Sequence, residues 1–245
     1  MSEPGGRPSR RLWARWTLAV TAGEVTGFLV PAAVGAATAD ASQFVQLVSL
    51  VAAGAVEGTL LGVSQGWVLR GMLPELPLGR WVRLTALAAA CAWLLAMIPA
   101  SLGGTVPTAA LIALMVPAGI AVLLSIGYVQ WRVLRDLLPH AGRWIPGTAA
   151  GWLAGLAVFT GITTPFWQPG QDFMTIALIG MLGASAMAVT MAAVTGAVMV
   201  RLVMGAAGGG LRQPVTSPGP GQSPPPPPHP EEPESEPDPA SKKPS

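Results

Sequence analysis

Six long stretches of this chain are apolar and almost free of charged residues, and this pattern constrains the fold more than any other feature. Each stretch is long enough to cross a hydrocarbon layer about 30 Å thick as an α-helix, which rises about 1.5 Å per residue. A helix also pairs its own backbone groups, as a bilayer requires. The sequence therefore predicts an all-α, polytopic membrane bundle of six transmembrane helices. The predicted spans are residues 13–37, 44–67, 81–102, 106–131, 144–163 and 173–202.

Composition agrees with a membrane protein and excludes two other classes. Charged residues make up 11% of the 245 residues, against about a quarter in an ordinary soluble protein. No cluster of bases lies outside the loops and the N-terminus, so we expect no nucleic-acid partner. Cys91 is the single cysteine, which excludes a disulfide scaffold. We expect a basic cytoplasmic N-terminus at 1–12, a six-span domain at 13–204 and a tail at 205–245.

The tail differs from the rest of the chain in composition. It contains a proline run at 224–228, an acidic stretch at 231–238 and then two lysines. Such a segment cannot bury enough apolar surface to fold, so we expect a disordered, proline-rich cytoplasmic tether. A solvating tail without a partner is the simpler interpretation, and the sequence names no partner for it.

The arginines predict the orientation of the chain. They lie before span 1, between spans 2 and 3, between spans 4 and 5, and after span 6, whereas the opposite loops hold Asp40 and Asp172. Loops rich in arginine stay in the cytoplasm. We therefore expect both termini in the cytoplasm and the protein in a bacterial inner membrane. Six tryptophans are expected at the headgroup level of that boundary: Trp13, Trp16, Trp67, Trp81, Trp131 and Trp144.

One alternative concerns the first span. Arg10 and Arg11, followed by an apolar run and Ala37-Thr38-Ala39, imitate a twin-arginine signal with a cleavage site. Glu24 and Pro31 within the run, and five further spans, favour a retained helix. Cleavage would remove Glu24.

A helical hairpin occurs twice in the chain. Residues 62–74 match 127–139 and residues 79–85 match 142–148, in the same order relative to the membrane, which predicts a parallel repeat with copies at about 45–102 and 107–163. The identical residues in the first copy are Gly62, Gln65, Val68, Leu69, Arg70, Leu73, Pro74, Gly79, Arg80, Trp81 and Thr85.

This pattern, a span ending in Gln-x-x-Val-Leu-Arg and a next span opening with Arg-Trp, resembles a group of mostly uncharacterised bacterial multi-spanning membrane proteins. The resemblance covers about residues 45–160. It implies a relationship of fold and brings no activity, cofactor or partner with it.

The polar residues of the repeated motif have two interpretations. In the first, four arginines contact lipid headgroups or another anion, and Gln65 and Gln130 supply polar lining on the cytoplasmic side. In the second, the motif only sets the hairpin geometry and its depth in the membrane. The four arginines are Arg70, Arg80, Arg135 and Arg143.

Glycines recur at every fourth position in span 2, at 54, 58, 62 and 66. Such ladders let two helix backbones approach closely, and shorter ones occur in spans 1, 5 and 6. We expect interfaces within one bundle. A homo-oligomer joined through these glycines is the alternative.

Two ionisable residues lie deep in the predicted spans, Glu24 in span 1 and Glu57 in span 2. They lie about 16 and 20 Å from the cytoplasmic ends of their helices. A carboxylate at the bilayer centre costs at least about 2.5 kcal/mol, so each should face inward, and no lysine or arginine lies at that depth as a partner. We expect the pair to share a proton or hold a cation; the alternative is two neutral acids that only join helices.

No catalytic residues are predicted, because no nucleophile in the spans has a base at a suitable spacing. His140 and His229 lie outside the spans, and neither a metal cluster nor a cofactor motif occurs. Two functions stay open. One is a small secondary transporter or proton- or cation-coupled permease, with its site at Glu24 and Glu57. The other is a non-transporting scaffold or accessory subunit whose cytoplasmic face binds lipid headgroups.

Overall fold

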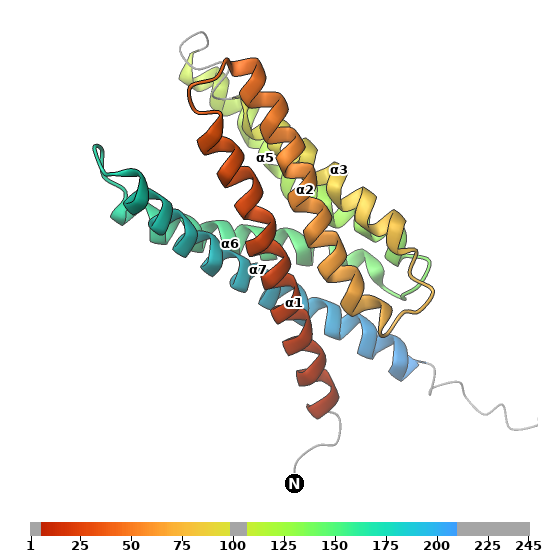
Figure 1. Ribbon diagram of the computed structural model, residues 1–245. Helices are drawn as coiled ribbons and strands as arrows, with labels where there is room; N and C mark the ends of the chain where they lie inside the picture. The colour runs from red at the N-terminus through yellow and green to blue at the C-terminus, as the bar shows by residue number, and fades with distance from the viewer. Residues whose placement is uncertain (1–5, 99–106, 210–245) are drawn as a thin grey trace, which may run out of the picture. The chain divides into compact units, whose positions relative to one another are not determined.

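The computed structural model describes residues 6–98 and 107–209, and every regular element within these ranges is a helix (Figure 1). The tail beyond residue 209, the outer end of the predicted third span and His229 lie outside the described residues. The elements are α1 (Gly6–Ala37), α2 (Gln43–Arg70), α3 (Leu78–Ala96), α5 (Thr108–Leu134), the short 3-10 helix η1 (Ala141–Arg143), α6 (Trp144–Phe166) and α7 (Phe173–Gly209).

Six helices in the described part of the chain are long and apolar enough to cross a membrane, which confirms the prediction of a multi-pass membrane protein. Their ends differ from the predicted ones. α1 begins at Gly6, and α7 continues to Gly209. The apolar pattern marks the part of a helix that lipid surrounds, whereas the hydrogen-bonded helix continues into the polar region beyond it.

The side chains are distributed as expected for a bundle surrounded by lipid, with large apolar residues on the outside. Large apolar residues point outward, among them Leu18 at 73% and Phe44 at 74% exposed. Hydrocarbon outside the bundle is as apolar as these side chains, so their exposure is not penalised. The interior instead holds small residues and eight buried polar ones: Glu24, Glu57, Gln65, Thr85, Gln130, Thr148, Thr163 and Thr195.

Helices α2 and α3 pack antiparallel along the glycines of α2. A Cβ atom at Gly58 would lie 2.5 Å from Ala89 Cβ and 2.9 Å from Ala86 Cα, and one at Gly54 would collide with Trp93. The lack of a side chain on this face therefore brings the two backbones together.

The two copies of the repeated motif make similar contacts at one matched position. A Cβ atom at Gly62 would lie 3.0 Å from Val82 Cα and 3.2 Å from Thr85 Cβ. At Gly127 the distances are 3.0 Å to Ile145 Cα and 3.2 Å to Thr148 Cβ. In each hairpin, the first helix thus presents a glycine to the first turns of the second.

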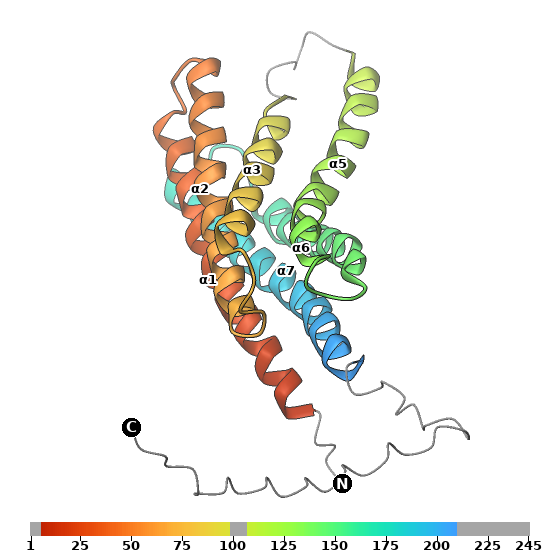
Figure 2. The ribbon, with the colours of Figure 1, turned by 90° about the vertical axis from the view of Figure 1, so that its right-hand side faces the viewer.

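The other helices complete the bundle around α1 and α7. Gly151 of α6 faces Thr195 and Met191 of α7, and Gly196 of α7 faces Trp16 of α1. Trp16 Nε1 donates to Thr195 Oγ1 at 3.1 Å. A buried apolar cluster lies at the end of the bundle that carries the arginines, and α3 and α5 diverge toward the opposite end (Figure 2).

The tryptophans correct one prediction. Trp16, Trp81 and Trp144 are fully buried between helices, so their rings do not face lipid headgroups, whereas Trp67 is largely exposed. Trp16 and Trp144 make an edge-to-face contact with ring centroids 5.8 Å apart. Glycines leave room for two of these rings, since Gly196 faces Trp16 and Gly66 faces Trp81.

Candidate functional site

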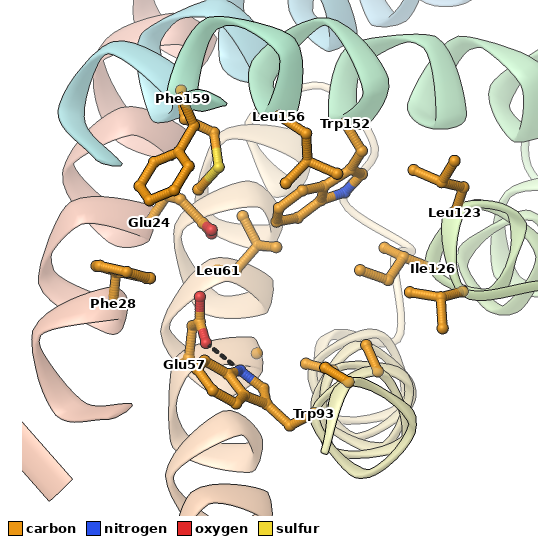
Figure 3. Close-up of a pocket in the computed structure, with 16 residues that line it drawn as sticks. Glu24, Phe28, Glu57, Leu61, Trp93, Leu123, Ile126, Trp152, Leu156 and Phe159 are labelled. Atoms are coloured by element: carbon orange, nitrogen blue, oxygen red, sulfur yellow. Dashed lines mark hydrogen bonds between the residues drawn. The ribbon is translucent and has the colours of Figure 1, made fainter. Parts of the chain in front are cut away.

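A partly open cavity of about 290 Å³ lies within the bundle, and all six long helices line it (Figure 3). Both deep carboxyl groups face it, Glu24 from α1 and Glu57 from α2. The rest of the wall is apolar and partly aromatic. It consists of Phe28, Gly58, Leu61, Ala89, Ala92, Trp93, Ala96, Val122, Leu123, Ile126, Trp152, Leu156, Phe159 and Met187.

Glu57 is held by one specific contact. Its Oε2 atom accepts a hydrogen bond from Trp93 Nε1 at 2.7 Å, and the residue is 8% exposed. The glycines at 54 and 58 let α3 approach α2 closely enough for the indole to reach the carboxyl group. A tryptophan in the middle of an apolar span needs an acceptor for its N–H, and this signal in the sequence points to a role for Trp93 that the sequence analysis missed.

Glu24 has no such contact. It is 1% exposed, no donor among the described residues bonds either carboxyl oxygen, and the Glu57 carboxyl group lies beside it, close enough to share a proton. Gly27, one turn further along α1, packs against the backbone of Glu57: a Cβ atom there would lie 3.2 Å from Glu57 Cα. This close crossing brings the two carboxyl groups into the same cavity, where Figure 3 shows both pointing inward.

Few protonation states of the two carboxyl groups are compatible with this cavity. No lysine, arginine or histidine is among its lining residues. Two carboxylates in a low-dielectric site repel one another and lose their hydration, so at least one takes a proton or both share a cation. Within residues 6–98 and 107–209, no group of three or more His, Cys, Asp or Glu side chains could hold a metal ion.

Two further unpartnered polar groups lie on the same helix as Glu24. Thr17 and Thr21 precede it at helical spacing, and neither buried hydroxyl has a hydrogen-bond partner within the described residues. Other threonines in the bundle donate to the carbonyl four residues earlier, as Thr59 does to Ala55 at 2.7 Å. Three polar groups on α1 thus form a line from the arginine-rich end to the cavity, because positions three and four residues apart share one helix face.

Gln65 and Gln130 meet each other instead of lining this cavity. Gln130 Nε2 donates to Gln65 Oε1 at 2.7 Å and to Thr85 Oγ1 at 3.0 Å, and Gln130 Oε1 accepts from Trp144 Nε1 at 2.9 Å. Both glutamines are buried. The network joins α2, α3, α5 and α6 through side chains of the repeated motif, as a structural contact would.

The four predicted arginines do not form one site. Arg70 ends α2, and Arg80 lies exposed in the first turn of α3. Arg135 Nε lies 3.5 Å from Asp136 Oδ1, and the guanidinium group of Arg135 lies over the ring of Trp131. Arg143 lines a second cavity, of about 250 Å³, together with His140, Arg201, Pro139, Val198, Leu202 and Gly205.

Compared with family models, with curated proteins and with solved structures, the chain has no match in any of the three. The resemblance of the repeated motif to bacterial membrane proteins therefore stays an expectation from the sequence.

Proposed function

We propose that this protein is a small secondary transporter, a permease that couples substrate movement to a proton or another cation through Glu24 and Glu57. The observation that carries the proposal is the pair of carboxyl groups in a cavity lined by all six long helices; one of the two, Glu24, receives no hydrogen bond from a donor in the described part of the chain. Ionisable groups at this depth are costly and mark ion and proton pathways in membrane proteins.

Two features support a transport role. Thr17 and Thr21 extend the line of buried polar groups from Glu24 toward the arginine-rich end; buried hydroxyls are normally hydrogen-bonded, often to water. Repeated hairpins also occur in transporters, where one half rocks against the other around a site near the midplane. The proposal includes an inner-membrane location in a bacterium, with the arginine-rich end in the cytoplasm.

The test is flux through purified protein in liposomes that enclose a pH-sensitive dye. Under an imposed pH gradient, Glu24→Gln and Glu57→Gln should each remove proton flux, because an amide of the same size cannot give up a proton. Glu75→Gln makes the same chemical change at an exposed position outside the cavity and should leave the flux as it is. Proton flux in the parent that both Glu24→Gln and Glu57→Gln leave unchanged would refute the permease, provided that the proteins are present at equal amounts.

A second candidate function rests on the second cavity. His140, Arg143 and Arg201 surround it without an acidic residue among its lining, and basic pockets at the ends of transmembrane helices bind anionic headgroups. A scaffold that recognises anionic lipid would use this face. Under this function, Arg143→Gln with Arg201→Gln should reduce the retention of phosphatidylglycerol relative to phosphatidylcholine in native mass spectrometry, while both glutamate variants stay silent in the flux assay.

A further inference from the structure

We propose that the cavity of Glu24 and Glu57 binds an organic monocation, an ammonium group attached to an apolar or aromatic body, and exchanges it for a proton. This inference rests on the proposed permease and names the substrate class of its site.

The wall of the cavity distinguishes an organic cation from a metal ion. Metal cations such as Na⁺, K⁺ and Ca²⁺ need a shell of several oxygen ligands, about six or more for Ca²⁺. The acidic oxygens here come from Glu24 and Glu57 alone, and Trp93 already occupies one of them. Nearly all of the remaining lining is carbon, so a bare metal ion would lose most of its hydration without replacement.

The same wall suits an ammonium ion that carries an apolar body. Trp93, Trp152, Phe28 and Phe159 present aromatic surface to the cavity (Figure 3). Aromatic faces attract alkylammonium groups, most strongly where both are desolvated. The carboxyl pair supplies the counter-charge, and the aliphatic wall takes up the apolar body.

The size of the cavity limits the ligand. Small-molecule sites usually enclose about 300–1,000 Å³, and this one, at about 290 Å³, is near the lower bound. An amine with one ring fits this volume better than a large polycyclic dye.

Charge balance explains the exchange. The titratable groups that face the cavity are Glu24 of α1 and Glu57 of α2, and α3, α5, α6 and α7 contribute no charged residue to its lining. With both acids protonated, the site is neutral. When one monocation enters and one proton leaves, the site is neutral again, so exchange avoids placing net charge in a low-dielectric interior.

The experiment measures binding directly, by calorimetry on the full chain in phosphatidylcholine nanodiscs. The probe is benzyltrimethylammonium, and its uncharged isostere neopentylbenzene is the control ligand. We expect saturable binding of the cation, release of about one proton per cation, and affinity that rises about tenfold per pH unit while both acids are protonated. Binding should weaken by about tenfold or more in Glu24→Gln and Glu57→Gln and stay unchanged in Glu75→Gln. Equal binding of neopentylbenzene, or parental affinity in both cavity variants, would overturn the inference.

Two variants that retain both carboxyl groups test the cavity itself. Ala92→Phe places a ring in the cavity and should block the probe, whereas Ala109→Phe adds the same ring at an exposed position of α5 and should not. Trp93→Phe keeps an aromatic ring but removes the N–H that bonds Glu57, so it should weaken binding even if Ala92→Phe does not fold. Parental affinity in Trp93→Phe and in folded Ala92→Phe would place the cation elsewhere.

The two proposals fail in different ways. Carboxyl-dependent proton flux without binding of the probe would overturn the organic-cation site and leave the permease standing. Binding that requires both carboxyl groups, without flux under any gradient, would overturn the permease and retain the site.

Discussion

At the scale of single residues, the interior of this bundle is organised by polar side chains in an apolar solvent. Gln65, Gln130, Thr85 and Trp144 bond one another, whereas neither oxygen of Glu24 receives a hydrogen bond from a donor within the described residues. A satisfied network holds helices together, and an unsatisfied group is available for a ligand or a proton. This difference separates the structural glutamines from Glu24, whereas Glu57 accepts the hydrogen bond from Trp93.

Gln130 should be important for stability. Replacing it with Leu leaves Trp144 Nε1 and Gln65 Oε1 without the partners that they now have, and each buried polar group without a partner costs about 1–3 kcal/mol. We expect a lower thermal unfolding temperature in detergent. Gln168→Leu, at an exposed position, is the matched control.

A double-mutant cycle isolates the bond between Trp144 and Gln130. Trp144→Phe removes the donor, so Gln130→Leu in that background should cost less than it does in the parent. Strictly additive costs would show that the two side chains do not act together.

The hydrogen bonds of Asp172, at the start of α7, predict that the stability of the fold depends on pH. Its carboxylate accepts hydrogen bonds from Thr175 Oγ1 at 2.6 Å and from Thr175 N at 3.1 Å, and these bonds hold its pKa below the usual value of 3.8. A folded-state pKa below the unfolded one stabilises the fold above about pH 4, and this contribution disappears as the pH falls through the folded-state pKa. Asp172→Ala should therefore lower the unfolding temperature at pH 6, and the difference from the parent should shrink toward pH 3. A constant difference over this range would argue against the ionised cap.

At the scale of elements, close helix contacts place the functional groups. α2 meets α3 along its glycines and meets α1 along the face that carries Glu57. The first contact brings Trp93 to Glu57, and the second brings Glu24 into the same cavity. Small residues thus determine the site by allowing the backbones to approach.

Gly58 tests this role of the α2 glycines. A side chain there meets Ala86 Cα and Thr85 O, each 2.9 Å from the added Cβ atom, and backbone atoms cannot move without shifting a helix. Gly58→Leu should destabilise the bundle by about 1–3 kcal/mol through overpacking.

A matched glycine provides the control. Gly119 of α5 has no atom within 4 Å of an added Cβ atom, so Gly119→Leu should be mild, as should Ala109→Leu at an exposed site. If Gly58→Leu and Gly119→Leu unfolded in detergent at the same temperature, α2 and α3 would not be packed as described.

At the scale of the whole molecule, the bundle is asymmetric along its length. A buried apolar cluster lies at the arginine-rich end, and α3 and α5 separate toward the other (Figure 2). The cavity lies between these regions and is lined by all six long helices.

The orientation of this asymmetry can be measured with fusions. A reporter that is active only in the cytoplasm should work after Arg83 or Arg143 and fail after Asp40 or Asp172, because arginine-rich loops stay in the cytoplasm. Activity after Asp172 would contradict the predicted six-span topology.

The sequence by itself determined that this protein is a membrane protein, and it determined the number of its long helices. Hydrophobicity and segment length are local properties, and both act on each span separately. The positions of Glu24 and Glu57 within their spans also marked them as the groups that need a partner or a ligand, because a buried charge is costly wherever its helix packs.

Only the tertiary structure decided how these groups meet. It placed Trp93 on Glu57, joined Gln65 to Gln130, and buried Trp16, Trp81 and Trp144 between helices. These outcomes depend on how each helix is rotated and where it crosses its neighbours. A span that is apolar on all sides encodes the rotation of its helix only weakly, because lipid and protein are equally apolar surroundings. The rotation is determined instead by glycine contacts and buried hydrogen bonds between helices that lie far apart in the chain.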